Sequence, residues 1–389
     1  MSKKSWSLVI VTVLAFGLAI SVSAWREPKQ SSPEPAVVPV QQVYTPETST
    51  ATVNGITVSF AAPQYDGVRL TLPYTIQANR DLSESVSLDG AEVKINGKSI
   101  NGGVMSRREP VAGRTASGVL QVISTDEVAD KFRVDVTLAK VSEVEGPWVF
   151  QLNGGKTAAP RADLHPNDQK KQGDLRFTVS DARIGREAGV VKYQTVTPVG
   201  SNSVRIDGVE LQDEQGRQLQ TLLASSWSGE AGVLQTTAVF NLYAEPPKQL
   251  VLLPYTVAAG EEMSPKNEIL RTTPWDGKTL PAKLDVGPGQ EATLTGAESL
   301  SDRTRLTFQV RSDDPFMTLG MLRAFDKQDR ELLELDPFAQ PASVKNGLYT
   351  FTREYSRLPL DQGLTFKIST RDRPQRKYLS ELTVRIPLD

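Results

Sequence analysis

The strongest constraint in this sequence is a pattern that recurs three times at a spacing of about 115 residues. Apolar, strand-like segments follow glycine at Gly118, Gly232 and Gly347. A repeat of this length is too long for a solenoid unit, which spans roughly 20–50 residues. The pattern therefore predicts tandem domains, and each repeat is long enough to bury a core of its own.

Within each repeat, apolar and polar residues alternate with the period of a β-strand. One predicted strand places five apolar side chains on a single face: Val68, Leu70, Leu72, Tyr74 and Ile76. The pair Asn96-Gly97 between two such runs is typical of a two-residue hairpin turn, because both central positions need a positive φ. We therefore predict an all-β chain of three tandem immunoglobulin-like antiparallel β-sandwiches.

Glycine- and proline-rich stretches mark the expected boundaries. The prediction is a membrane anchor or signal peptide over 1–26, a proline-rich stalk over 27–50, and β-sandwich domains over 51–155, 170–272 and 288–389. The stretch from Thr272 to Gly289 is interpreted as the linker between the second and third domains. Pro73 and Pro254 fall inside predicted strands, so we expect each at a sheet edge or a bulge, because proline cannot donate a ladder hydrogen bond.

The N-terminal segment predicts export. Lys3 and Lys4 precede an apolar run from Trp6 to Trp25, and twenty helical residues span about 30 Å, enough for a bilayer core. The two lysines favour a single-pass orientation with the C-terminus outside the cell membrane. Val22-Ser23-Ala24 is also an acceptable cleavage site, which would make the chain a secreted protein cleaved after Ala24. Both alternatives place residues 26–389 outside the cytoplasm.

The composition argues against several function classes. With 44 Lys plus Arg against 46 Asp plus Glu, the net charge of −2 gives no electrostatic attraction to nucleic acid. The chain has no cysteine, which excludes thiolate catalysis and disulfides. Its single histidine, His165, precedes a proline in a predicted linker, where a linker role is favoured over that of a catalytic base or metal ligand. Acidic pairs such as Asp126-Glu127 lack the spacing of a calcium loop. We expect no metal, no cofactor and no enzymatic activity.

Two tryptophans and one basic run are the candidate interaction residues. Trp227 and Trp275 lie in glycine-containing, loop-like segments, whereas Trp148 alternates with core residues. Exposed aromatic residues on loops are enriched at interfaces, and Trp227 is the better candidate of the two. The basic run either contacts an anionic wall polymer or forms a solvated hairpin loop, and it contains Arg371, Arg373, Arg376 and Lys377.

Four stretches of the sequence resemble parts of a known family. The stretches Val53 to Val58 and Asp66 to Ile76 resemble the start of an uncharacterised extracellular domain of Gram-positive spore-former membrane proteins, several of them anti-sigma-factor-like. The stretch Val144 to Phe150 is similar to the closing G-x-W-x-F strand of that domain, and residues 170–258 resemble the immunoglobulin-like domain that often follows it. The family's cytoplasmic sigma-binding segment has no counterpart here, since only Met1 to Ser5 precede the apolar run.

These observations favour a non-enzymatic envelope protein that acts as an interaction or sensing module, with an envelope protein or a wall polymer as its partner. Two alternatives remain open. The first is an ectodomain that works with a separate membrane-bound sigma-factor regulatory system. The second, less favoured, is a wall-polymer enzyme that uses carboxylates alone.

Overall fold

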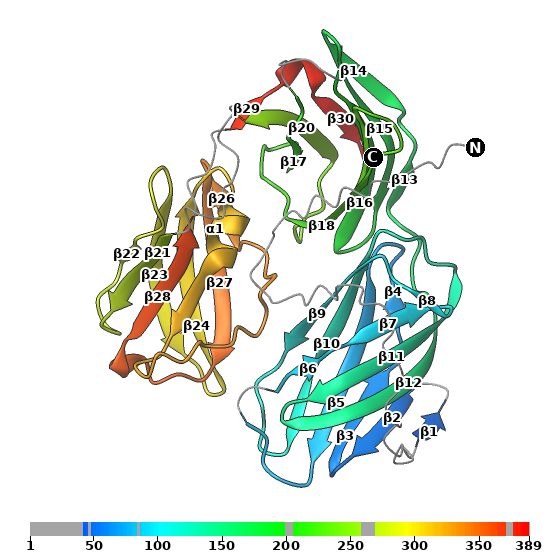
Figure 1. Ribbon diagram of the computed structural model, residues 1–389. Helices are drawn as coiled ribbons and strands as arrows, with labels where there is room; N and C mark the ends of the chain where they lie inside the picture. The colour runs from blue at the N-terminus through cyan, green and yellow to red at the C-terminus, as the bar shows by residue number, and fades with distance from the viewer. Residues whose placement is uncertain are drawn as a thin grey trace, which may run out of the picture.

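The computed structural model describes residues 42–45, 48–83, 86–198, 205–257, 269–370 and 376–388. Nearly all the regular structure in these ranges is β-strand, arranged almost entirely in antiparallel sheets, so the all-β prediction is confirmed (Figure 1). The predicted membrane run from Trp6 to Trp25 lies outside them. Across the described ranges, no helix has the length and apolar character needed to cross a membrane.

The first unit, residues 48–156, surrounds a core that contains Trp148, Phe60 and Phe150. The Phe60 and Phe150 rings meet edge-on, with their centroids 4.8 Å apart. The predicted hairpin at Asn96-Gly97 is confirmed, because both residues have a positive φ and join β7 to β8. The strands of this unit are β2 (Thr48–Val53), β3 (Ile56–Ala61), β4 (Gln64–Tyr65), β5 (Leu70–Ala78), β6 (Leu88–Asp89), β7 (Glu92–Ile95), β8 (Lys98–Ser99), β9 (Gly102–Arg108), β10 (Thr115–Ser124), β11 (Lys131–Val141) and β12 (Val144–Lys156). A further short strand, β1 (Gln42–Thr45), pairs with β2.

The second unit packs two sheets on one core, which includes the fully buried rings of Phe177 and Phe240. One sheet has the order β13-β15-β16-β19-β18, with β14 also paired to β15. Its strands are β13 (Ala162–Leu164), β14 (Asp168–Gln172), β15 (Leu175–Ile184), β16 (Ala188–Val196), β18 (Thr221–Trp227) and β19 (Val233–Asn241). The facing sheet contains β17 (Gly208–Asp213), β20 (Gln249–Val257), β29 (Arg376–Tyr378) and β30 (Val384–Pro387).

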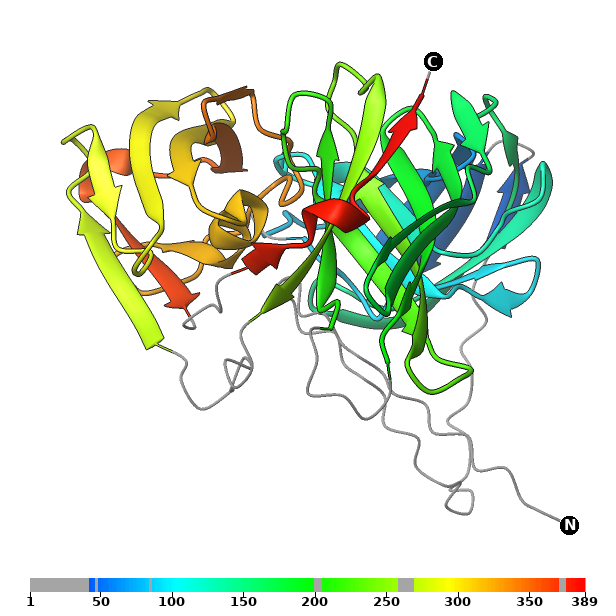
Figure 2. The ribbon, with the colours of Figure 1, turned by 90° about the horizontal axis from the view of Figure 1, so that it is seen from above.

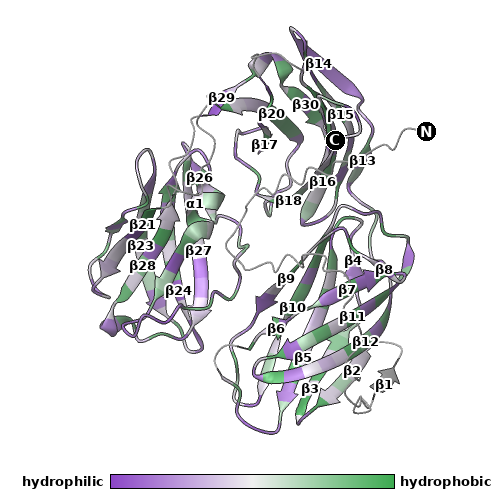
Figure 3. Cartoon of the chain, in the orientation of Figure 1, coloured by the Kyte–Doolittle hydropathy of each residue, from purple (hydrophilic) through white to green (hydrophobic). Residues whose placement is uncertain are grey.

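The third unit, residues 269–370, has a core around Phe308 and Phe366, whose rings lie edge to face at 5.8 Å. Apolar and polar residues alternate along its strands, as the hydropathy colouring in Figure 3 shows. A single short helix, α1 (Pro315–Met321), begins at the N-cap Asp314. The strands are β21 (Ile269–Trp275), β22 (Ala282–Leu284), β23 (Glu291–Ser299), β24 (Arg303–Arg311), β25 (Leu322–Phe325), β26 (Ser343–Lys345), β27 (Leu348–Ser356) and β28 (Leu364–Thr370).

The strand pairing corrects two predicted boundaries. β21 begins at Ile269 and pairs with β28 of the third unit, so part of the predicted linker from Thr272 to Gly289 is a strand of that unit. The C-terminal segment, predicted to complete a domain over 288–389, returns instead to the second unit, where β30 pairs with β20 (Figure 1, Figure 2). Alternation identifies a strand but not its partner, which explains both errors. The third unit is therefore inserted between β20 and β29 of the second.

This insertion predicts that the last strand stabilises the second unit. Ile386 is 3% exposed in the second core, so Ile386→Ala should lower the free energy of unfolding by about 2–5 kcal/mol. Its neighbour Arg385 is exposed on the same strand, and Arg385→Ala should change that free energy by less than about 0.5 kcal/mol. Denaturant titration of both variants checks this, and equal effects of the two would contradict the assignment of β30 to a core.

The first and second units join through the loop between β4 and β5. One carboxylate oxygen of Asp66 accepts hydrogen bonds from the backbone of its own loop, and the other accepts one from Arg186 N at 2.8 Å. Gly185 lies so close to Asp66 that a Cβ there would come within 2.8 Å of a carboxylate oxygen. A small apolar cluster seals this contact and consists of Val68, Ile123, Ala188 and Val239. A loop of one unit is thus seated on a turn of the other.

A buried chain of polar side chains runs through all three units. Arg69 of the first unit donates to the Asn241 side chain of the second, and Asn241 Nδ2 donates to Gln220 Oε1 at 2.8 Å. Gln340 of the third unit donates to the same Gln220 oxygen at 3.1 Å. Arg69, Gln220 and Asn241 are each less than one-tenth exposed. Burial lowers the pKa of Arg69, while Glu187 and Asp66 act in the opposite direction and favour its charged form.

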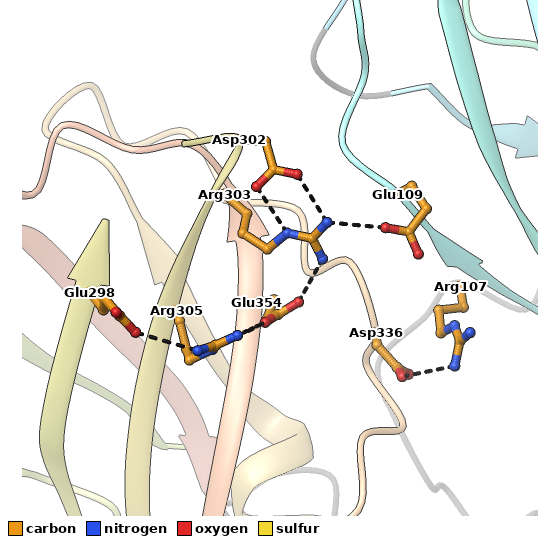
Figure 4. A network of polar contacts seen from close by, with 8 residues as sticks. All are labelled: Arg107, Glu109, Glu298, Asp302, Arg303, Arg305, Asp336 and Glu354. Atoms are coloured by element: carbon orange, nitrogen blue, oxygen red, sulfur yellow. Dashed lines mark hydrogen bonds and ion pairs between the residues drawn. The ribbon is translucent and has the colours of Figure 1, made fainter. Parts of the chain in front are cut away.

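The third unit meets the first mainly through ion pairs (Figure 4). Arg303 donates to Glu109 at 3.2 Å, and Arg107 lies 3.9 Å from Asp336. One backbone hydrogen bond of 2.9 Å, from Arg108 N to Leu335 O, accompanies them. Because Glu109 and Arg107 are about half exposed, solvent screens these ion pairs, and each contributes about 0–1 kcal/mol.

The buried arginine predicts a large effect of substitution at the junction. Arg69→Ala leaves the buried Asn241 oxygen without its donor and should lower the free energy of unfolding by about 1–3 kcal/mol. Arg114 is a matched arginine, because its only described ion pair, with Asp81, is two-thirds exposed or more on both sides. Arg114→Ala should change stability by less than about 0.5 kcal/mol. Chemical denaturation of the two variants, compared with the parent chain, provides the measurement.

Candidate binding groove and interface residues

An apolar-lined opening in the second unit lies between the edges of its two sheets. Its volume is about 330 Å³, within the roughly 300–1,000 Å³ range of small-molecule pockets. β17 and β18 form its sides, and residues of β16 and β19 form its floor. Phe316 and Met317 of α1 close one end, so the third unit contributes to the wall. We call this opening the β17–β18 groove. Its apolar lining residues include Ile206, Val209, Leu211, Leu219, Leu222, Leu234 and Ala238.

Arg376 organises the polar end of the β17–β18 groove. Its guanidinium donates to Glu210 at 2.9 Å and to Asp314 at 3.0 Å, and it stacks 4.8 Å from the centroid of the Tyr255 ring. Burial alone would lower the pKa of Arg376, but Tyr255, Asp314 and Glu210 together outweigh it and raise that pKa. Tyr378 OH also donates to Glu210 at 2.6 Å. Arg376 is therefore a clamp that ties the second unit to α1 of the third.

The carboxylates that line the groove are already bonded within the protein. Both oxygens of Glu210 accept hydrogen bonds, one from Gln212 and the other from Arg376 and Tyr378. Asp314 caps α1 through Met317 N at 2.9 Å, and its second oxygen pairs with Arg376. Asp207 likewise accepts from Arg205 with one oxygen and from the backbone of Val257 with the other. These groups hold the wall of the groove in shape.

The predicted interaction residues differ in their exposure to solvent. Trp227 is 55% exposed at the end of β18, as an interface residue requires. Trp275 is only 5% exposed and belongs to the third core, with its indole nitrogen donating to Thr279 O at 2.8 Å, so it does not present a surface to a partner. Lys377 is exposed on β29 beside the buried clamp. Arg371 and Arg373 lie outside the described residues.

Two other predictions concern titratable groups. His165 Nδ1 lies 2.8 Å from Asp181, and the histidine is about two-thirds exposed, which fits a surface pair. Of the acidic pairs, Glu127 bonds to Arg183 and Lys192 across the first junction. In the described part of the chain, no cluster of His, Asp and Glu has the arrangement of a metal site.

A second cavity of about 90 Å³ lies where the third unit meets the first. It contains Glu334, whose carboxylate accepts from Arg353 at 2.5 Å and whose other oxygen has no protein partner among the described residues. Burial raises the pKa of Glu334 to about 7, against the opposing effects of Arg353 and Arg323. Sequence reasoning missed this residue, because it sits in an irregular segment with no local motif.

The raised pKa of Glu334 predicts a pH-dependent stability term. Its folded-state pKa of about 7 exceeds the ordinary 4.5, so the stabilisation is complete below pH 4.5 and is lost as the pH rises through 7. The difference corresponds to about 3 kcal/mol. The difference in unfolding free energy between the parent chain and Glu334→Gln should therefore fall by about 3 kcal/mol as the pH rises from 4.5 to above 7. A difference that stays constant between these pH values, measured by denaturant titration, would contradict the prediction.

Comparison with known proteins gives little further information. No family model matches the chain, and no curated protein matches it. Among solved structures, the chain is similar to a conserved domain protein from Bacillus anthracis, with a TM-score of 0.40 and 14% sequence identity over 61% of this chain and 82% of that chain. A similarity of this strength assigns no function.

Proposed function

We propose that this chain is a non-enzymatic, extracytoplasmic interaction module of three immunoglobulin-like β-sandwiches, with an envelope component as its partner. The β17–β18 groove is the observation that carries the proposal, because an apolar opening of about 330 Å³ adjoins β18, and Trp227 is exposed on the opposite face at the end of that strand. The apolar sequence run from Trp6 to Trp25 supports an extracytoplasmic location.

The groove favours binding over catalysis. Its carboxylates are occupied by Arg376, Tyr378 and backbone donors, whereas a general acid or base must reach a substrate proton at about 2.6–3.2 Å. Its apolar walls and fixed polar end are typical of a recognition surface. Trp227 adds a large ring of the kind that dominates interface energetics.

Trp227 provides the test of this function. Cross-linking of the full-length chain on intact exporting cells should capture an envelope component, and Trp227→Ala should reduce the captured amount about tenfold, as expected for an interface hot spot. Val149→Ala, which truncates another exposed apolar side chain on a different strand, should leave capture unchanged. Failure of the parent chain to capture any protein or wall component would refute the proposal.

A further inference from the structure

The outer edge of β18 lacks a neighbouring strand. β18 ends its sheet and, within the described ranges, pairs only with β19. Its residues from Thr221 to Ser226 are all half-buried, and Trp227 is exposed. A strand edge of this kind presents a row of backbone N–H and C=O groups that can pair with another chain.

β18 also lacks the protection that the other outer strands of the second and third units carry. Proteins usually guard a strand edge with charged residues or proline. The sequence of β18 is Thr-Leu-Leu-Ala-Ser-Ser-Trp, without a charge or a proline. By contrast, at least one charged residue occurs in each of β13, β14, β17, β21, β22, β25, β26, β29 and β30.

β17, the edge strand of the facing sheet, is only partly covered, so there is room for another strand beside β18. The far half of β17 is already covered, because Leu219 N donates to Leu211 O at 2.8 Å. Over its first half, from Gly208 to Glu210, no described strand pairs with the side of β17 that faces away from β20. The β17–β18 groove lies between the two edges, with an apolar floor that includes Leu234 and Ala238. An added strand would therefore cover apolar surface as well as forming backbone hydrogen bonds.

Side chains alternate between the two faces of β18, so a strand added at its edge would contact both the groove and Trp227. Ala224 pairs with Ala238 of the second core, so Ala224 and Ser226 face the groove, whereas Ser225 and Trp227 project from the opposite face of the strand. A strand paired with β18 would direct one row of side chains into the groove. It would place the other row on the outer face beside Trp227.

The charged residues that line the groove indicate that a bound segment carries a basic residue. Three carboxylates line the groove, from Asp207, Glu210 and Asp314. They pair with only two guanidinium groups, Arg376 in the lining and Arg205 beside Asp207, so one negative charge is in excess. Although each carboxylate is internally bonded, their summed field favours a cationic residue in the occupant. An anionic wall polymer is disfavoured here for the same reason.

We propose that the outer edge of β18 binds an extended segment of a partner protein as an added β-strand, and that this segment is apolar at alternate positions and carries a basic residue. The proposal rests on the proposed function and identifies its partner as a protein segment. Strand addition of this kind takes its affinity from main-chain hydrogen bonds and its specificity from the pockets for alternate side chains.

Site-specific photo-cross-linking in cells that export the full-length chain tests the proposal. A photoreactive residue replaces Ser225 in β18 or, as a control, Lys283, an exposed residue of the edge strand β22. The Ser225 position should yield adducts whose mass spectra identify an alternating, basic partner peptide. The Lys283 position should give at least about tenfold less of this peptide, as expected where no groove adjoins the edge.

A groove variant separates strand addition from incidental proximity. Ala224→Lys places a long cation in the groove and should reduce the Ser225 adducts at least about tenfold. Ala61→Lys makes the same substitution at an exposed position of β3 in the first unit, which does not line the groove, and should leave the adducts unchanged. Melting curves establish that both variants fold. If Ala224→Lys does not, Met317→Lys on the opposite wall makes the same test.

The outcomes distinguish the two proposals. Adducts to glycan alone, equal yields at the Ser225 and Lys283 positions, or adducts that persist in the folded groove variant would overturn strand addition. Each of these leaves the interaction function in place, provided that Trp227-dependent capture persists. If no adduct forms at either position and the parent chain captures nothing, the interaction function itself fails.

Discussion

The arrangement of the three units depends on the buried hydrogen-bond chain from Arg69 through Asn241 and Gln220 to Gln340. Each unit supplies at least one member. Displacing the first unit would leave the Asn241 oxygen without its donor Arg69, and displacing the third would remove the second donor to the Gln220 oxygen. An unpaired buried polar group costs about 1–3 kcal/mol, and more when it is charged. The apolar cluster around Val68 adds contact area but little direction, since apolar packing is not directional. The polar chain therefore specifies how the units meet, and the exposed ion pairs between the first and third units only supplement it.

The insertion of the third unit has a direct consequence for the candidate site. The chain leaves the second unit after β20 and returns through β29, whose Arg376 binds both Glu210 and the N-cap Asp314. This clamp holds α1 against the groove, where Phe316 and Met317 form one end wall. A second unit without the insertion would lack that wall. The groove is thus a product of two units rather than of a single sandwich.

Sequence reasoning predicted what is local and missed what is long-range. Alternation found the strands and Trp148, and the positive-φ requirement found the Asn96-Gly97 turn. Pro73 and Pro254 lie within paired strands, yet each falls between two ladders on one side: those of β3 and β4 for Pro73, and those of β29 and β30 for Pro254. Local pattern could not show that β30 returns to β20, that Trp275 is buried, or that Arg376 is a clamp. All three depend on contacts between residues far apart in the sequence.

The position of β18 limits how tightly an added strand can bind. Leu222 and Leu223, at its beginning, pack on the small apolar cluster against the first unit, so only the half that ends at Trp227 is open to a partner. Four to five added residues would form about two or three backbone hydrogen bonds, each worth a net of about 1 kcal/mol. That gain is smaller than the cost of association, which is about 4–15 kcal/mol, so apolar burial in the groove and against Trp227 must supply the rest. A short edge therefore favours a reversible contact, in which the side chains of the partner decide whether binding occurs.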